Sequence, residues 1–463
     1  MKKFWLVLLS LGLIMAFSVS AFAVDVKVSG EYYAAGLYLN KVNVDSHSYG
    51  PNDGDDLSTA FYFQRLRVGT DFIVSPCLKL VTRFDAMERI WGGERSDVED
   101  SDSFSAGTRA ENQNIAFDLV YIDYTAPVGQ FRVGYQKEST WGTIFGNMGE
   151  STPTGQIRYD GTFGAFSVVA MIAKMTDNSY SAIRDDERKT DRDSDSYRVG
   201  GIYNFKNDKV NGQVGLLLIY GRDATERYEH WSYSHFNRIY TVNPYFKATI
   251  GPVFFQGEAK YAFGDYQDFD KANTWRTDVK ADALSVFLDA TANFGMFNVG
   301  GSFAYLSGDD PGTDDKKEGG FNTAGIDWNP CLILFNNDVI NYWVGGIGSH
   351  FGTEINGPMS NAWFFQGRAG VKPTPQLDIN LAVSHAFADK RPAPWQWGST
   401  YPNGTYGTEI DLTGTYKITN NLSYMLGAGY LFTGDYYKGY GHTSTEGQVN
   451  DDFILINKLT LTF

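Results

Sequence analysis

The stretch "FILINKLTLTF", residues 453–463, alternates apolar and polar side chains up to its last residue. One parity carries Phe453, Leu455, Leu459, Leu461 and Phe463, and the other carries Lys458, Thr460 and Thr462. Such alternation predicts a β-strand with one apolar face and one polar face. Because unpaired chain ends fray, a strand that reaches residue 463 is expected to pair with another strand. We therefore expect this strand to close a sheet.

The first 23 residues have the pattern of a cleaved secretory signal. Lys2 and Lys3 precede an apolar run over 4–17, and Ala21-Phe22-Ala23 provides an A-x-A cleavage site. We expect 1–23 to be removed and 24–463 to form one domain. Loss of the two lysines takes the formal net charge from −15 to −17. This acidic balance argues against nucleic acid as a partner, since phosphate binding requires a basic surface.

The rest of the chain alternates between short turns and long polar connections. Each turn contains Gly, Pro, Asn or Asp, which suit chain reversal; the eight turns lie at 75–77, 127–129, 161–164, 206–209, 251–252, 294–296, 372–375 and 418–421. The long connections include charge-rich stretches such as "PNDGDD" and "GDDPGTDDKKEGG". Eight short turns and about nine long loops predict about 18 antiparallel strands.

The composition of the chain favours a barrel that spans a membrane. Aromatic residues make up 16% of the chain, there are 50 glycines, and no later segment is apolar for long enough to form a spanning helix. In "NLSYMLGAGYLF", residues 421–432, the apolar parity would face lipid, and the same holds for Leu377, Ile379, Leu381 and Val383. Because a bilayer requires every backbone group to be paired, the sheet must close on itself. The predicted fold is an all-β, transmembrane, antiparallel up-and-down β-barrel.

A signal segment, an alternating last strand and a terminal Phe463 together resemble Gram-negative outer-membrane porins. That resemblance implies short periplasmic turns, long extracellular loops, and recognition of Phe463 by the barrel-assembly machinery. A looser likeness is to the alginate-export family, carried by "FYFQRLRVGTDFIVSPCLKLVTRFDAMERIWGG", residues 61–93. The implied location is the outer membrane of a Gram-negative bacterium.

About 18 strands enclose a lumen too wide for side chains to fill. Alternation places eight arginines toward that lumen: Arg65, Arg67, Arg83, Arg89, Arg132, Arg158, Arg198 and Arg368. Acidic candidates on the same face are Asp71, Asp85, Glu138 and Asp160. The arginines could select small anionic or polar solutes, since rings of charge set pore selectivity. Equally, they could neutralise carboxylates of the wall.

Two connections could narrow the pore. The segment 140–155, "TWGTIFGNMGESTPTG", is small and weakly charged. The longest connection, 308–359, contains the apolar run "CLILFNNDVINYWVGG", which should not be exposed to water. That run could fold into the lumen, pack on a neighbouring subunit, or add a hairpin that raises the strand number to about 20. Pro330 disfavours the hairpin.

Signals for catalysis or metal binding are weak. The chain contains no H-E-x-x-H, G-x-S-x-G or C-x-x-C motif. The two cysteines, Cys77 and Cys331, fall at opposite ends of the predicted topology, so we expect free thiols. We expect no enzyme activity, no metal and no cofactor.

The sequence therefore predicts a porin, a water-filled channel for passive diffusion of small hydrophilic solutes, with anionic solutes expected. Expected partners are outer-membrane lipid and lipopolysaccharide, the barrel-assembly machinery, small solutes and, if the long loop packs between barrels, two further copies in a homotrimer. Alternatives are an alginate-type polysaccharide exporter, a barrel that scaffolds a multihaem electron-transfer cytochrome, and an adhesin. The haem of a scaffolded complex would belong to the partner, because the chain has no C-x-x-C-H.

Overall fold

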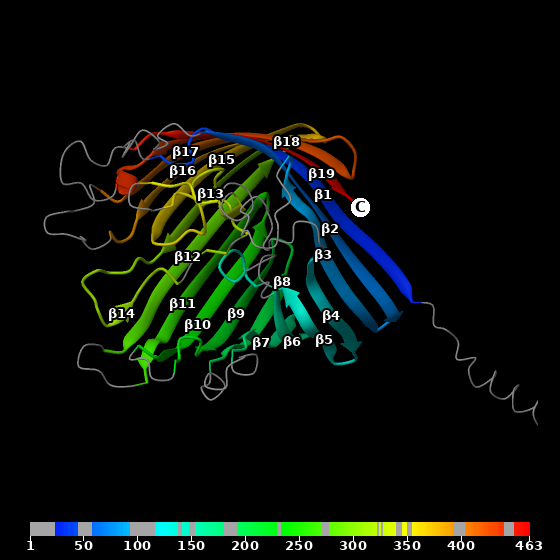
Figure 1. The fold of residues 1–463 in the computed structure, drawn as a ribbon. Coiled ribbons are helices and arrows are strands. Elements are labelled where there is room, and N and C mark those ends of the chain that lie inside the picture. Colours follow the sequence, from blue (N-terminus) through cyan, green and yellow to red (C-terminus); the bar gives the residue numbers. More distant parts are fainter. Residues whose placement is uncertain are drawn as a thin grey trace, which may run out of the picture.

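The chain forms one closed antiparallel barrel of 18 strands with a short extra strand, as predicted (Figure 1). The computed structural model describes residues 24–44, 58–92, 116–137, 141–147, 153–178, 192–228, 233–270, 277–321, 324–325, 327–338, 345–349, 354–391, 403–438 and 449–463. The expected signal segment, 1–23, lies outside these ranges. Among the described residues, no helix is long and apolar enough to cross a membrane.

The strands are β1 Asp25–Leu39, β2 Thr59–Ser75, β3 Leu78–Ile90, β4 Ala116–Ala126, β5 Gly129–Lys137, β6 Pro153–Phe163, β7 Phe166–Thr176, β8 Ser194–Lys206, β9 Val210–Asp223, β10 His235–Ile250, β11 Val253–Phe269, β12 Val279–Phe294, β13 Phe297–Leu306, β14 Lys316–Lys317, β15 Ala362–Thr374, β16 Leu377–Ala388, β17 Thr405–Lys417, β18 Leu422–Thr433 and β19 Asp452–Thr462. The short 3-10 helix η4 spans Asp435–Lys438. Each wall strand pairs with its sequence neighbour in the ring, and β14 adds a two-residue parallel pair to β12. All eight predicted turns join consecutive strands.

The last strand closes the barrel against the first. β19 pairs with β1 from Glu31↔Thr462 to Leu39↔Ile454. The backbone N–H of Gly30 donates to the carbonyl of Phe463 at 2.8 Å, and the N–H of Phe463 donates to the carbonyl of Gly30 at 3.0 Å. A Cβ at residue 30 would lie 2.5 Å from the Phe463 ring, so the ring requires glycine there.

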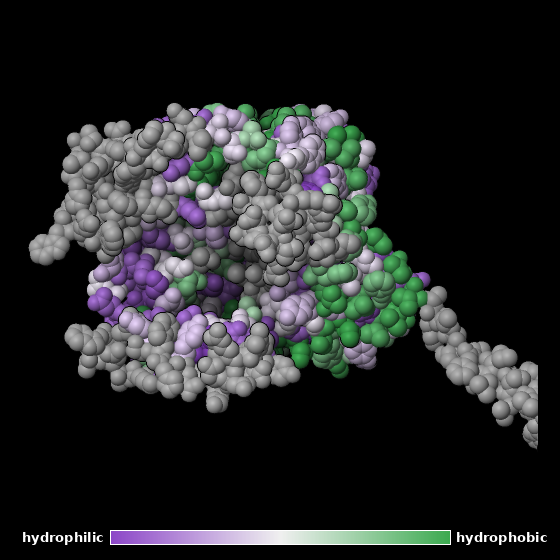
Figure 2. All heavy atoms as spheres, viewed as in Figure 1, coloured by the Kyte–Doolittle hydropathy of each residue, from purple (hydrophilic) through white to green (hydrophobic). Residues whose placement is uncertain are grey.

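The two faces of the wall differ as the alternation predicts. Leu455 of β19 and Phe463, which follows that strand, are 49% and 53% exposed on the outer face, whereas Ile454 on the inner face of β19 is fully buried. Apolar side chains continue around the outer wall, and Figure 2 shows them as a hydrophobic region over β1–β4. Exposed apolar surface of this extent is expected where lipid, not water, covers the wall.

Candidate pore constriction

Arginines line the inner wall over β2–β8, on the lumen side of the alternating strands. The inward parity of β2 carries Arg65 and Arg67, and its outward parity carries Tyr62, which is 51% exposed. Inward positions on the other strands hold Arg83, Arg132, Arg158, Arg198 and Arg368. Seven of the eight predicted arginines therefore lie on the lumen face.

Arg89 is the exception, and the expectation that it faces the lumen is wrong. Its register partner is Gln64, on the outward parity of β2, while the next pair is Leu66↔Ala86. Two residues of β3 thus oppose one of β2, which defines a bulge that reverses the parity beyond it. Met87 accommodates the bulge with a φ of 55°. Consequently Glu88 takes the inward position, 3.7 Å from the Arg65 guanidinium.

Carboxylates pair with the inward arginines. Arg67 makes a forked contact with Asp85, at 2.7 Å from Nε and 2.6 Å from Nη2. Arg158 binds Asp160 in the same way, at 2.7 and 2.8 Å. Planar forked pairs of this kind are strong and geometrically specific.

The remaining inward arginines also have polar partners, over a wider range of distances. Guanidinium-to-carboxylate distances are 3.4 Å for Arg83–Asp118, 3.8 Å for Arg65–Glu31, 3.5 Å for Arg132–Asp160 and 2.5 Å for Arg368–Asp289, and Arg198 donates to Ser196 at 3.0 Å. Asp71 pairs with Lys79 at 2.7 Å instead of with an arginine. Glu138, the last predicted acidic residue, lies outside the described residues. The arc of arginines is therefore largely neutralised within the wall.

A first loop, residues 141–147, folds against the wall and is held by Glu258 of β11. One Glu258 oxygen accepts the backbone N–H groups of Thr143, Ile144 and Phe145 at 2.6, 2.7 and 3.2 Å, and the other accepts that of Gly146 at 2.8 Å. Glu258 is 3% exposed. Consecutive backbone donors can stabilise a buried carboxylate without a basic partner.

Local packing fixes the same loop. The indole N–H of Trp141 donates to the carbonyl of Asn243 at 3.1 Å, and its ring packs edge-on against Tyr245. Gly142 has a φ of 65°, and a Cβ there would lie 2.8 Å from the Glu258 carboxylate. A side chain at residue 142 would therefore obstruct the anchor.

A second loop, residues 327–338, is held by Glu409 of β17. The Glu409 carboxylate accepts the N–H groups of Leu332, Ile333 and Leu334 at 2.9, 2.7 and 2.7 Å. Glu409 is fully buried. The described residues 327–338 form no hairpin. Of the three expectations for the apolar run, folding into the lumen is the one that its described part meets.

The two loops meet inside the barrel and form what we call the plug, residues 141–147, 324–325, 327–338, 345–349 and 354–359. The N–H of Gly325 donates to the carbonyl of Ile144 at 3.0 Å. Their apolar side chains share one buried cluster with inward residues of β1, β12, β13 and β15–β19; it includes Ile144, Phe145, Ile333, Leu334, Phe335, Ile347, Met359 and Phe364. The plug thus gives one side of the lumen an apolar core.

Acidic residues of the plug lie toward the basic wall. Asp327 is stabilised in its charged form by Lys137 and Arg67, and Asp338 by Lys458 and Arg65. Burial nevertheless dominates and raises the pKa of both carboxyl groups. Figure 2 shows a hollow bordered by hydrophilic side chains on the viewed face of the barrel.

Sequence reasoning did not identify Glu258, Glu409 or Glu88. The inward parity of Glu258 and Glu409 could be read from the alternation, but the loop residues that they hold are 75 to 115 positions away in the chain. Glu88 was hidden by the bulge.

Comparison with solved structures supports the fold. The chain is similar to the Pseudomonas aeruginosa proteins OccK11 (OpdR) and OccK8 (OprE), at 11% and 12% sequence identity, each with a TM-score of 0.50. These matches cover 94% of this chain and 96% and 98% of theirs. No protein-family profile matches the sequence, and no curated protein matches it. The chain thus has the barrel fold of these two proteins, which is the fold expected from the resemblance of its sequence to Gram-negative outer-membrane porins.

Proposed function

We propose that the chain is a porin that lets small hydrophilic solutes diffuse passively across the outer membrane, with a preference for anions. The observation that carries this proposal is a closed barrel whose outer face is apolar and whose inner face is charged. A lumen-facing wall of charged pairs is of use only where water and solute pass. The plug would narrow that path to the side lined by β2–β8.

The preference for anions rests on the balance of charge beside the plug. Arginine stays charged at any ordinary pH. The facing acids Asp327 and Asp338 have raised pKa values because they are buried, so they lose their negative charge at a higher pH than ordinary carboxyl groups do. Arg65 and Arg67 would then attract anionic groups despite their wall partners.

The test is to record currents from the purified protein in a planar bilayer with a gradient of potassium chloride. The proposal predicts stepwise conductance and a reversal potential that favours chloride. A silent bilayer, with protein shown to be folded by its heat-dependent migration on a gel, would contradict it. Conductance that favours potassium would retain the porin and remove the anion preference.

Export of an anionic polysaccharide is the second candidate, favoured by the plug itself. Such an exporter is expected to have a loop deep in the lumen and a continuous basic track. It would remain closed to simple salts in the bilayer experiment. A cytochrome scaffold is disfavoured, because the plug occupies lumen that a partner protein would need.

A further inference from the structure

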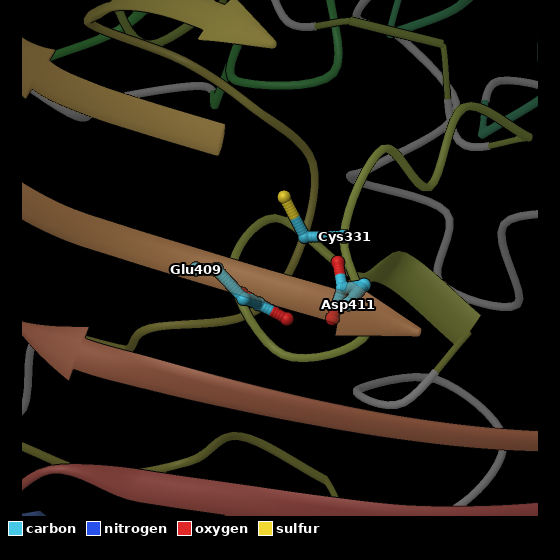
Figure 3. Close-up of side chains that lie close together, drawn as sticks. All are labelled: Cys331, Glu409 and Asp411. Atoms are coloured by element: carbon cyan, nitrogen blue, oxygen red, sulfur yellow. The ribbon is translucent and has the colours of Figure 1, made fainter. Parts of the chain in front are cut away.

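Three side chains that bear metal-binding atoms meet where the plug touches the wall. Cys331 belongs to the plug, and Glu409 and Asp411 project inward from β17 (Figure 3). One ligand atom from each lies within 4.8 Å of the other two. All three residues are buried, with exposures of 3%, 0% and 5%.

The two carboxylates lack a compensating cation among the described residues. Glu409 receives three backbone N–H groups, whereas Oδ1 of Asp411 is buried without any hydrogen-bond partner. Neither carboxylate forms an ion pair with a described residue. Two adjacent buried carboxylates require either a shared proton or a bound cation.

The donor set selects the kind of cation. A thiolate with two carboxylates suits a borderline-soft divalent ion such as zinc, whereas magnesium and calcium prefer oxygen alone. Zinc holds sulfur at about 2.3 Å and oxygen at about 2.0–2.2 Å, so neighbouring ligands lie roughly 3.5 Å apart. From a spread of at most 4.8 Å, small side-chain rotations would complete the site.

A cavity of about 360 Å³ lies beside the trio, between the plug and the inner wall. Cys331 and Asp411 both line it, together with Asn336, Asp338 and Lys458. It offers an entry path for a hydrated ion and space for water as a fourth ligand. The buried thiol is therefore reachable although its residue is only 3% exposed.

We propose that Cys331, Glu409 and Asp411 form a binding site for a divalent transition-metal ion of the zinc class, which fastens the plug to β17. On binding, the Cys331 thiol loses its proton to solvent and the sulfur becomes a ligand. Any proton shared by the two carboxylates also leaves to solvent. Because the sulfur must be deprotonated to bind the ion, binding weakens as pH falls.

The experiment uses the full barrel carrying Cys77→Ser, which removes the other, exposed thiol. The protein is equilibrated with Zn²⁺, freed of excess metal and assayed for zinc by mass spectrometry. One zinc per chain is expected. Changing a residue that only hydrogen-bonds to a metal ligand costs about 10–100-fold in affinity, so loss of a ligand itself in Cys331→Ser or Asp411→Asn should cost at least as much. Asp338→Asn, in the same cavity but outside the trio, should retain zinc.

A second measurement uses protein with the trio intact, so it does not depend on whether the ligand variants fold. In the protein with its trio intact, Zn²⁺ should slow maleimide labelling of Cys331, and Mg²⁺ should not. The site would be overturned if the protein with the intact trio held no more zinc than Cys331→Ser, or if Zn²⁺ did not affect labelling. Either result would mean that the two carboxylates share a proton instead of binding a metal ion. Both readouts are made on folded protein without current measurement, so they are independent of the porin proposal.

Discussion

The inner wall over β2–β8 and the inner wall under the plug both carry acidic side chains, but the two walls stabilise these acids in different ways. Over β2–β8, acids such as Asp85 face guanidinium groups, as in the forked Arg67–Asp85 pair. Under the plug, Glu258 and Glu409 have backbone N–H groups as partners in place of cations. Acids in a wall that faces water are held by charge, whereas acids in a wall that faces polypeptide serve as anchors for it.

The largest expected effect is that of Glu258→Ala. It would leave four consecutive N–H groups of residues 143–146 buried without an acceptor. Since an unsatisfied buried donor costs about 1–3 kcal/mol, the free energy for opening of this loop should fall on the order of 4 kcal/mol. Hydrogen exchange of these amides checks it. Unchanged protection would mean that Glu258 is not the anchor.

Glu409→Ala should have the next largest effect, because three N–H groups lose their acceptor. The opening free energy of residues 332–334 should fall on the order of 3 kcal/mol. Maleimide labelling of Cys331, in a chain without Cys77, should become faster. Glu409→Gln retains an acceptor oxygen, so its labelling rate should lie between those of the protein with Glu409 and of Glu409→Ala. Equal labelling in all three proteins would contradict the anchor.

On the charged side, Arg65→Ala with Arg67→Ala should weaken anion preference. A unit charge at about 4 Å contributes about 1 kcal/mol in water, so the anion-to-cation permeability ratio should fall roughly fivefold or more. Arg89→Ala is the matched control, because the bulge at Met87 turns that arginine outward. Reversal potentials measure both. An equal effect of Arg89→Ala would show that the assignment of faces is wrong.

The smallest expected effect is that of pH. Ordinary carboxyl groups titrate at about 3.9, and burial raises the pKa of Asp327 and Asp338 above that value. As pH falls from 7, these two acids become neutral at a higher pH than ordinary carboxyl groups do, and the lumen becomes more positive. Anion preference should therefore increase with acidification. Asp327→Asn with Asp338→Asn should show the higher preference already at pH 7 and a flatter pH profile.

Much of the wall could be predicted from the sequence, because alternation and turns are local properties. The inward and outward faces of β19 and all eight turns follow from residues within a few positions of each other. The free states of Cys77 and Cys331 followed from that topology and are confirmed.

The interior was harder to predict because its contacts are distant in sequence. The Glu409–Leu334 contact joins residues 75 positions apart, and the Glu258–Thr143 contact joins residues 115 apart. No sequence pattern indicates the bulge at Met87, yet this bulge turns Glu88 inward and Arg89 outward. The apolar run after Pro330 indicated burial, but not which wall would receive it.

The most direct test of the account is the single-channel conductance of the wild-type barrel and of the Glu258→Ala, Glu409→Ala double variant in the same bilayers. The account predicts small, stable steps for the wild type and larger, noisier steps for the variant, because the plug loses both anchors. Equal conductance in two folded proteins would contradict a plug that narrows the lumen.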